Sequence, residues 1–70
     1  MDILKLFGSR VQKLRIDGGW SQEAFAELAG LHRTYISGIE RGIRNPTLVI
    51  VQRIADALSI SPSDLLKVGE

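Results

Sequence analysis

The chain has 70 residues, 44% of them hydrophobic and none of them cysteine, and its formal net charge is +1. This length predicts a single domain, residues 1–70, with a marginal core, because so short a chain buries only roughly 60% of its unfolded surface. The hydrophobic content argues against disorder, and the lack of cysteine excludes disulfides and thiolate metal sites.

Neither the start of the chain nor any later segment resembles a targeting or membrane sequence. The opening MDILKLF lacks the basic region and small-residue cleavage site of a signal peptide. No apolar run approaches the roughly 20 residues that span a bilayer. We therefore expect a cytoplasmic protein without a membrane partner.

The first two predicted helices have clear start and stop signals. The first, Ile3–Asp17, carries an apolar stripe and ends at two glycines. The second, Gln22–Ala29, begins after the N-cap residue Ser21 and ends at Gly30, which suits a left-handed terminus. The stripe of the first helix is Leu4, Phe7, Val11 and Leu14, and the inward residues of the second are Phe25, Leu28 and Ala29. Trp20 and Phe25 are spaced as a hydrophobic staple across the start of the second helix.

A third helix, predicted over Arg33–Arg41, starts three residues after Gly30. It buries Ile36 and Ile39, and Ala26 on the preceding helix is small enough to let it cross closely. Its outer side carries small polar and basic residues: Arg33, Thr34, Ser37, Gly38 and Arg41. A helix that packs on one side and is polar and basic on the other suits the recognition helix of a helix-turn-helix.

Residue types and spacing over this region resemble a known family. The residues Gln22, Ala26, Gly30, Ile36 and Ile39 fall as in the helix-turn-helix of Cro/phage-repressor-like (XRE) DNA-binding domains. The run RTYISGIERGIRNPTL, Arg33 to Leu48, resembles the controller proteins of restriction–modification systems. The resemblance extends from Phe7 to Leu66. It implies an all-α, compact five-helix DNA-binding domain whose second and third helices form the helix-turn-helix.

The predicted function is a sequence-specific regulator of transcription that binds a two-fold double-stranded DNA operator as a homodimer. Arg33 is expected to read guanine, Thr34 a thymine methyl group, and Ser37 either kind of base edge. Gln22, Tyr35, Arg44 and Asn45 are expected to contact the DNA backbone. For Tyr35 a base contact is the alternative, and for Arg44 an exposed loop cation is the alternative.

Three further residues of the region carry structural predictions. In the family, a basic residue at the position of Arg15 pairs with the glutamate near the end of the recognition helix, here Glu40; the alternative is that both are solvated. Gly38 costs ~1 kcal/mol relative to alanine inside a helix, which either a close approach to DNA or tight helix packing would explain. His32 stands where an Asp or Ser cap is expected, and its ring nitrogen can take that role.

The C-terminal third predicts two more helices and a dimer interface. Thr47 caps a helix over Leu48–Leu58, and the segment SPSD starts a short one over Pro62–Lys67. The buried face of the former is expected to be Leu48, Val51, Ile54, Ala55 and Leu58. The dimer interface is assigned to Ile50, Ile60, Leu65, Leu66 and Val68. The alternative is that these residues close the monomer core.

Other classes of function fit less well. An enzyme needs a convergent acid–base or nucleophilic set, which one histidine and scattered carboxylates do not supply. We therefore expect no catalytic residue, no metal, no cofactor and no small-molecule ligand. A protein-interaction module on the same fold, such as an antitoxin or a phage-type repressor domain, is the better alternative. Large apolar residues in place of Arg33, Thr34 and Ser37 would favour it.

Overall fold

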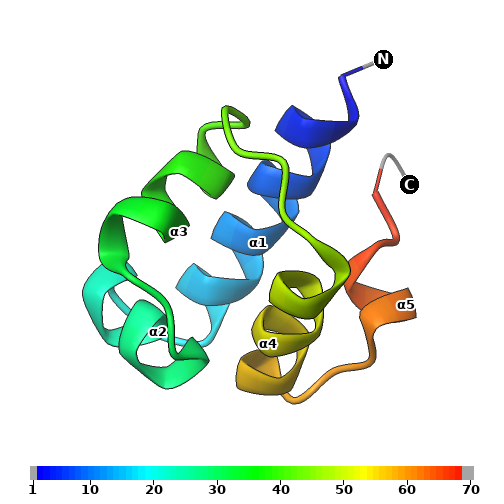
Figure 1. The fold of residues 1–70 in the computed structure, drawn as a ribbon. Helices are drawn as coiled ribbons and strands as arrows, with labels where there is room; N and C mark the ends of the chain where they lie inside the picture. Colours follow the sequence, from blue (N-terminus) through cyan, green and yellow to red (C-terminus); the bar gives the residue numbers. More distant parts are fainter. Residues whose placement is uncertain (1, 69–70) are drawn as a thin grey trace.

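The computed structural model describes residues 2–68, which form five α-helices and no β-strand (Figure 1). The helices are α1 (Ile3–Asp17), α2 (Gln22–Ala29), α3 (Arg33–Glu40), α4 (Leu48–Leu58) and α5 (Pro62–Leu65). The all-α class and the bounds of α1, α2 and α4 are confirmed. α3 ends one residue and α5 two residues earlier than predicted, because Arg41 and Leu66 already take the positions of C-cap residues.

The helix starts are capped by the side chains that the sequence indicates. Hydroxyl oxygens of Ser21, Thr47 and Ser61 accept hydrogen bonds from backbone N–H groups of the first turns of α2, α4 and α5. At the start of α3, Nδ1 of His32 accepts from the backbone N–H of Thr34 at 3.2 Å. The imidazole therefore performs the capping role usually taken by Asp or Ser.

The helices enclose one apolar core. It contains Phe7, Val11, Phe25, Ala26, Ile36, Ile39, Val51, Ile54, Ala55 and Leu65. The predicted staple is present, with the ring centres of Trp20 and Phe25 5.8 Å apart. In Figure 1, α1 lies between α3 and α4, and the start of α1 and the end of α5 lie toward the same side. The core thus leaves the outer side of α3 and the face beside α5 uncovered.

Two residues expected in the core are exposed instead. Leu28 faces solvent because α2 packs on α3 and α4 through Phe25, Ala26 and Ala29, which leaves Leu28 outside that contact. Leu48 is 83% exposed because, as the first residue of α4, it lies at the rim of an open hollow rather than under a neighbouring helix. Helical spacing places both residues near the right stripe but does not fix how far the neighbouring elements extend.

Candidate nucleic-acid interface

α3 packs on the core through one side and leaves its other side open. Ile36 and Ile39 are almost fully buried, whereas Arg33, Thr34 and Arg41 are exposed and Ser37 is half-buried. Among residues 2–68, neither Arg33 nor Arg41 takes part in a salt bridge. The predicted base-reading residues therefore share one accessible, cationic side of a single helix.

The one acidic residue of α3 is turned away from this side. Glu40 lies inside the molecule and forms a two-pronged ion pair with Arg15 of α1, with Nε to Oε2 at 2.7 Å and Nη2 to Oε1 at 3.0 Å. The side chains of Arg15 and Glu40 are only 9% and 2% exposed. The pair implied by the family resemblance is therefore present and buried. It also removes a negative charge from the surface that Arg33 and Arg41 share.

Gln22 and Trp20 complete the polar cluster around this pair. The side-chain amide of Gln22 donates to Oε1 of Glu40 at 3.0 Å, and Nη1 of Arg15 donates to the carbonyl oxygen of Trp20 at 2.8 Å. Gln22 was predicted to contact a DNA phosphate, but one of its two amide hydrogens is directed into the protein. The reason is that the start of α2 faces the end of α3, where Glu40 lies. This partner for Gln22 was not anticipated from the sequence.

Two glycines without a predicted role fix the end of α3 against α1. A Cβ atom on Gly8 would overlap the carbonyl oxygen of Ile39 and lie 2.8 Å from that of Glu40. A Cβ atom on Gly42 would lie 2.9 Å from Cα of Lys5. The signal for Gly8 was available, since a glycine inside a helix is unfavourable without a packing reason.

The loop after α3 brings the remaining predicted DNA contacts beside the helix. Arg44 and Asn45 are exposed, and the guanidinium carbon of Arg44 lies 5.4 Å from the centre of the half-buried Tyr35 ring. Tyr35, Arg44 and the outer residues of α3 thus form one continuous surface, which we call the α3 surface: Arg33, Thr34, Tyr35, Ser37, Arg41, Arg44 and Asn45.

Comparison with known proteins assigns this arrangement to a family. A family model described as helix-turn-helix matches residues 11–65, which include α2 and α3. The chain belongs to the helix-turn-helix family. It is 47% identical over 66 residues to the control protein C.BamHI of Bacillus amyloliquefaciens, covering 93% of this chain and 82% of that protein.

Solved structures agree with this assignment. The crystal structure of the restriction-modification controller protein C.AhdI from Aeromonas hydrophila superposes with a TM-score of 0.85 at 48% identity, covering 91% of each chain. The regulator SinR, solved in complex with DNA, gives a TM-score of 0.82 at 32% identity and covers 87% of this chain and 98% of that one. The predicted resemblance to controller proteins is confirmed.

Most of the residues assigned to a dimer interface do not form a surface. Leu65 is fully buried in the core, so its assignment to the interface was wrong. Ile50, Ile60 and Val68 are half-buried and pack against the core. Of the five, only Leu66 is substantially exposed, at 47%. Leu65 and Leu66 are adjacent, so their side chains point in different directions, and the sequence alone did not show which of them would be buried in the core.

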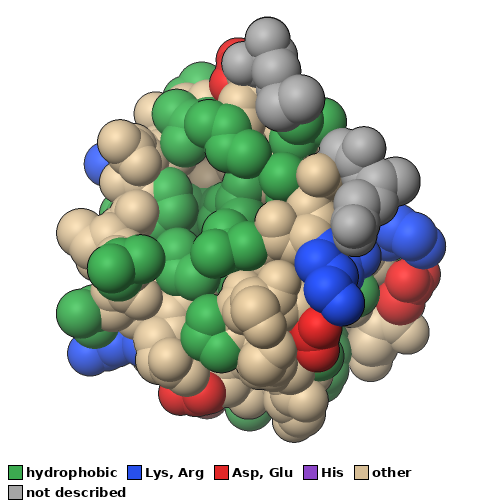
Figure 2. All heavy atoms as spheres, turned by 90° about the vertical axis from the view of Figure 1, so that its right-hand side faces the viewer, with side chains coloured by type: hydrophobic (Ala, Val, Ile, Leu, Met, Phe, Trp, Pro, Cys, Tyr) green, Lys and Arg blue, Asp and Glu red, His purple; other side chains and the backbone are tan. Residues whose placement is uncertain are grey.

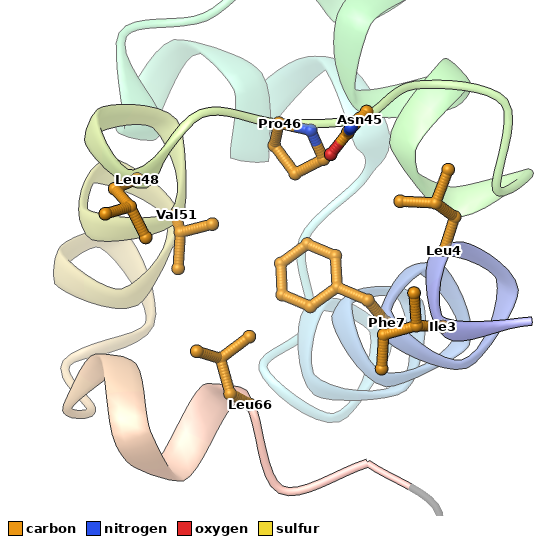
Figure 3. Close-up of a pocket in the computed structure, with 8 residues that line it drawn as sticks. All are labelled: Ile3, Leu4, Phe7, Asn45, Pro46, Leu48, Val51 and Leu66. Carbon is orange, nitrogen blue, oxygen red and sulfur yellow. The ribbon is translucent and has the colours of Figure 1, made fainter.

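An apolar hollow does lie next to Leu66. Its volume is about 220 Å³, and it is lined by Ile3, Leu4, Phe7, Asn45, Pro46, Leu48, Val51 and Leu66. Figure 2 shows hydrophobic side chains gathered around it, and Figure 3 shows that they come from α1, the loop before α4, α4 and the end of α5. We call this cavity with its eight lining residues the apolar hollow.

The described residues show little else of a chemical site. Between Asp2 and Val68, no three histidine or acidic side chains come together as metal ligands, and no helix is both long and apolar enough to cross a bilayer. A hydrogen bond from Lys67 lowers the pKa of the half-exposed Asp64 carboxyl on α5.

Proposed function

We propose that the protein is a sequence-specific regulator of transcription of the controller type, which binds a two-fold double-stranded DNA operator as a homodimer. The observation that carries the proposal is the α3 surface: its arginines face outward while Glu40, the only acid of α3, is neutralised inside by Arg15. The similarity to control proteins and to a regulator solved with DNA supports the same function.

In the proposed complex the start of α3 enters the major groove. Arg33 donates two hydrogen bonds to O6 and N7 of a guanine, Thr34 contacts a thymine methyl group, and Ser37 hydrogen-bonds a base edge. The hydroxyl of Tyr35, the guanidinium of Arg44 and the amide of Asn45 contact phosphates beside the groove. Gln22 reaches a phosphate only with the amide hydrogen that Glu40 does not take.

The apolar hollow is the proposed dimer interface, and its occupant is a second copy of the chain. Leu48 lies at the rim of the hollow and is 83% exposed, so in a two-fold arrangement the Leu48 of each copy can enter the hollow of the other. The hollow is lined by apolar side chains and Asn45, without a charged residue among them. Since Asn45 and Pro46 also belong to the loop after α3, pairing here would fix the distance between the two α3 helices, about 34 Å for successive half-sites.

The DNA-binding proposal is tested by selecting bound duplexes from a random pool. We expect a two-fold consensus for the wild type. Arg33→Ala should relax one base-pair position per half-site, at a cost of about 1–3 kcal/mol, while Arg44→Ala should weaken all sequences evenly. A consensus unchanged in Arg33→Ala would contradict base reading by Arg33, and selection of no duplex at all would refute the function.

The dimer proposal is tested by sedimentation of exposed-residue variants. Leu66→Asp and Leu48→Asp should convert a dimer to a monomer and abolish tight operator binding, with the far-UV helical signal preserved. Ile16→Asp is the matched control, because Ile16 is an exposed isoleucine of α1 that does not line the hollow. A wild type that sediments as a monomer at tens of micromolar and binds a single half-site tightly would refute the dimer.

A further inference from the structure

Arg44 does not extend freely from its loop but lies along α3. A Cβ atom on Gly38 would come within 2.6 Å of Cγ of Arg44 and 3.2 Å of its Nε. Gly38 is buried, although it follows Ile36 by two positions and so faces away from the core. The side chain of Arg44 therefore fills the space that a side chain on Gly38 would occupy. Its guanidinium lies within cation–π distance of the Tyr35 ring, one turn before Gly38.

The backbone explains why this arginine meets this glycine. The N–H of Ile43 donates to the carbonyl oxygen of Gly38 and the N–H of Gly42 to that of Ile39, both at 3.0 Å. Together with the left-handed φ of 75° at Gly42, these bonds form a Schellman motif. The motif hydrogen-bonds Ile43, the residue before Arg44, to Gly38 itself. The backbone of Arg44 is therefore held close to Gly38, and its side chain lies back along α3.

We propose that Gly38 and Tyr35 are positioning residues that hold Arg44 as a rigid part of the DNA-binding surface. The inference deepens the proposed function and rests on it for the identity of the ligand, a DNA phosphate. An unrestrained arginine loses much rotamer freedom when it binds a phosphate, whereas one already held on α3 loses less. A single methyl group at Gly38 would displace the side chain of Arg44, so glycine is needed here for the position of Arg44 and not for the stability of α3.

The first arm of the test examines the free protein and needs no DNA. Arg44 side-chain protons should show an upfield ring-current shift from Tyr35 in NMR spectra. Tyr35→Phe keeps the ring and should keep the shift, while Tyr35→Leu and Gly38→Ala should lose it. Unshifted Arg44 protons in the wild type would overturn the inference without touching the proposed function.

The second arm is a double-mutant cycle on a duplex taken from the random-pool selection. Gly38→Ala should weaken binding and lower the slope of log affinity against log salt by about 0.9, the value for one lost phosphate contact, as Arg44→Ala should. In the Arg44→Ala background, Gly38→Ala should then have no further effect. Thermal unfolding serves as a control, because alanine favours a helix more than glycine and the variant should not be less stable.

The cycle separates this inference from simpler explanations. If Gly38→Ala weakens binding equally in both backgrounds, its methyl group meets the DNA or distorts α3, and the positioning role is wrong. If Gly38→Ala binds as the wild type does, the role is wrong as well. If the wild type binds no duplex, the proposed function fails and the role in DNA binding fails with it, while the NMR arm still reports whether Arg44 rests on α3.

Discussion

α3 and α4 pack against the same core through similar stripes, yet their first turns present different chemistry to solvent. The buried residues Ile36 and Ile39 of α3 correspond in kind to Val51 and Ile54 of α4. Outside, α3 shows Arg33, Thr34 and Arg41, whereas the first turn of α4 shows Leu48 and Val49. The inward faces account for the fold, and they would serve any helical domain. We propose that the outer side of α3 meets a polyanion and the first turn of α4 a second apolar surface.

The two helices are also held in different ways. The end of α3 is fixed by directional contacts, namely the Arg15–Glu40 ion pair and the close backbone approach at Gly8. The buried residues of α4 are all apolar. Directional contacts set an orientation, while apolar contacts mainly require that surface be covered. A helix that must place side chains in a DNA groove needs a fixed orientation, and therefore directional contacts, more than α4 does.

Removing Glu40 should have the largest effect, because it strands a buried cation. We expect Glu40→Ala to lower the free energy of unfolding by about 3–5 kcal/mol, measured by urea denaturation. The matched control is Asp17→Ala, which breaks the ion pair with Lys13 on the surface of α1, where the two side chains are 57% and 70% exposed. That change should cost less than about 1 kcal/mol. Equal losses in the two variants would show that the buried pair does not fix α3.

Closing the gap between α1 and α3 should have an intermediate effect. Gly8→Ala adds a methyl group against the carbonyl oxygens of Ile39 and Glu40, which are backbone atoms and cannot rotate away. We expect a loss of roughly 1–3 kcal/mol, reduced in part by the better helix propensity of alanine. Ser9→Ala, at the exposed neighbouring position, is the control and should be near neutral. A fully stable Gly8→Ala variant would mean that α1 and α3 can separate without penalty.

The sequence predicted the helices well because their ends depend on local signals. Ser21, Thr47 and Ser61 cap helices through hydrogen bonds to residues three positions away. Gly30 ends α2 with the left-handed φ that a glycine allows. The stripe of α1 was also right in kind, with Phe7 fully inside. Such features require only neighbours along the chain, and these are visible in the sequence.

Apart from the ends of α3 and α5, what the sequence missed concerns residues that meet across space. Leu48 and Leu65 were assigned to the wrong environments, because the position of the hollow depends on where the start of α1 and the end of α5 lie relative to α4. The hydrogen bond from Gln22 to Glu40, which is 18 residues away, was not predicted. For Gly38 the sequence left open a close approach to DNA or tight helix packing. In the structure the nearest side chain is that of Arg44, beyond the end of α3. The DNA contacts themselves stay predictions.

The ends of the helices provide the smallest and sharpest comparison between the helix-turn-helix and the C-terminal part. The C-cap residues of α2 and α4 are Gly30 and Ser59, both left-handed, with φ of 70° and 59°. In both, a pair of backbone N–H groups closes the last turn.

Serine in the left-handed region of backbone conformation is strained by its Cβ atom, so Ser59→Gly should raise the free energy of unfolding by about 0.5–1 kcal/mol in thermal melts. Gly30→Ser should lower it by a similar amount, since the nearest atom to its new Cβ, Nη1 of Arg53 at 3.5 Å, leaves room and only the backbone strain remains. Changes in the free energy of unfolding that are similar in size and opposite in sign would show that the two helix ends differ only in their C-cap residue. A loss of stability in Ser59→Gly would mean that another interaction favours serine at that position.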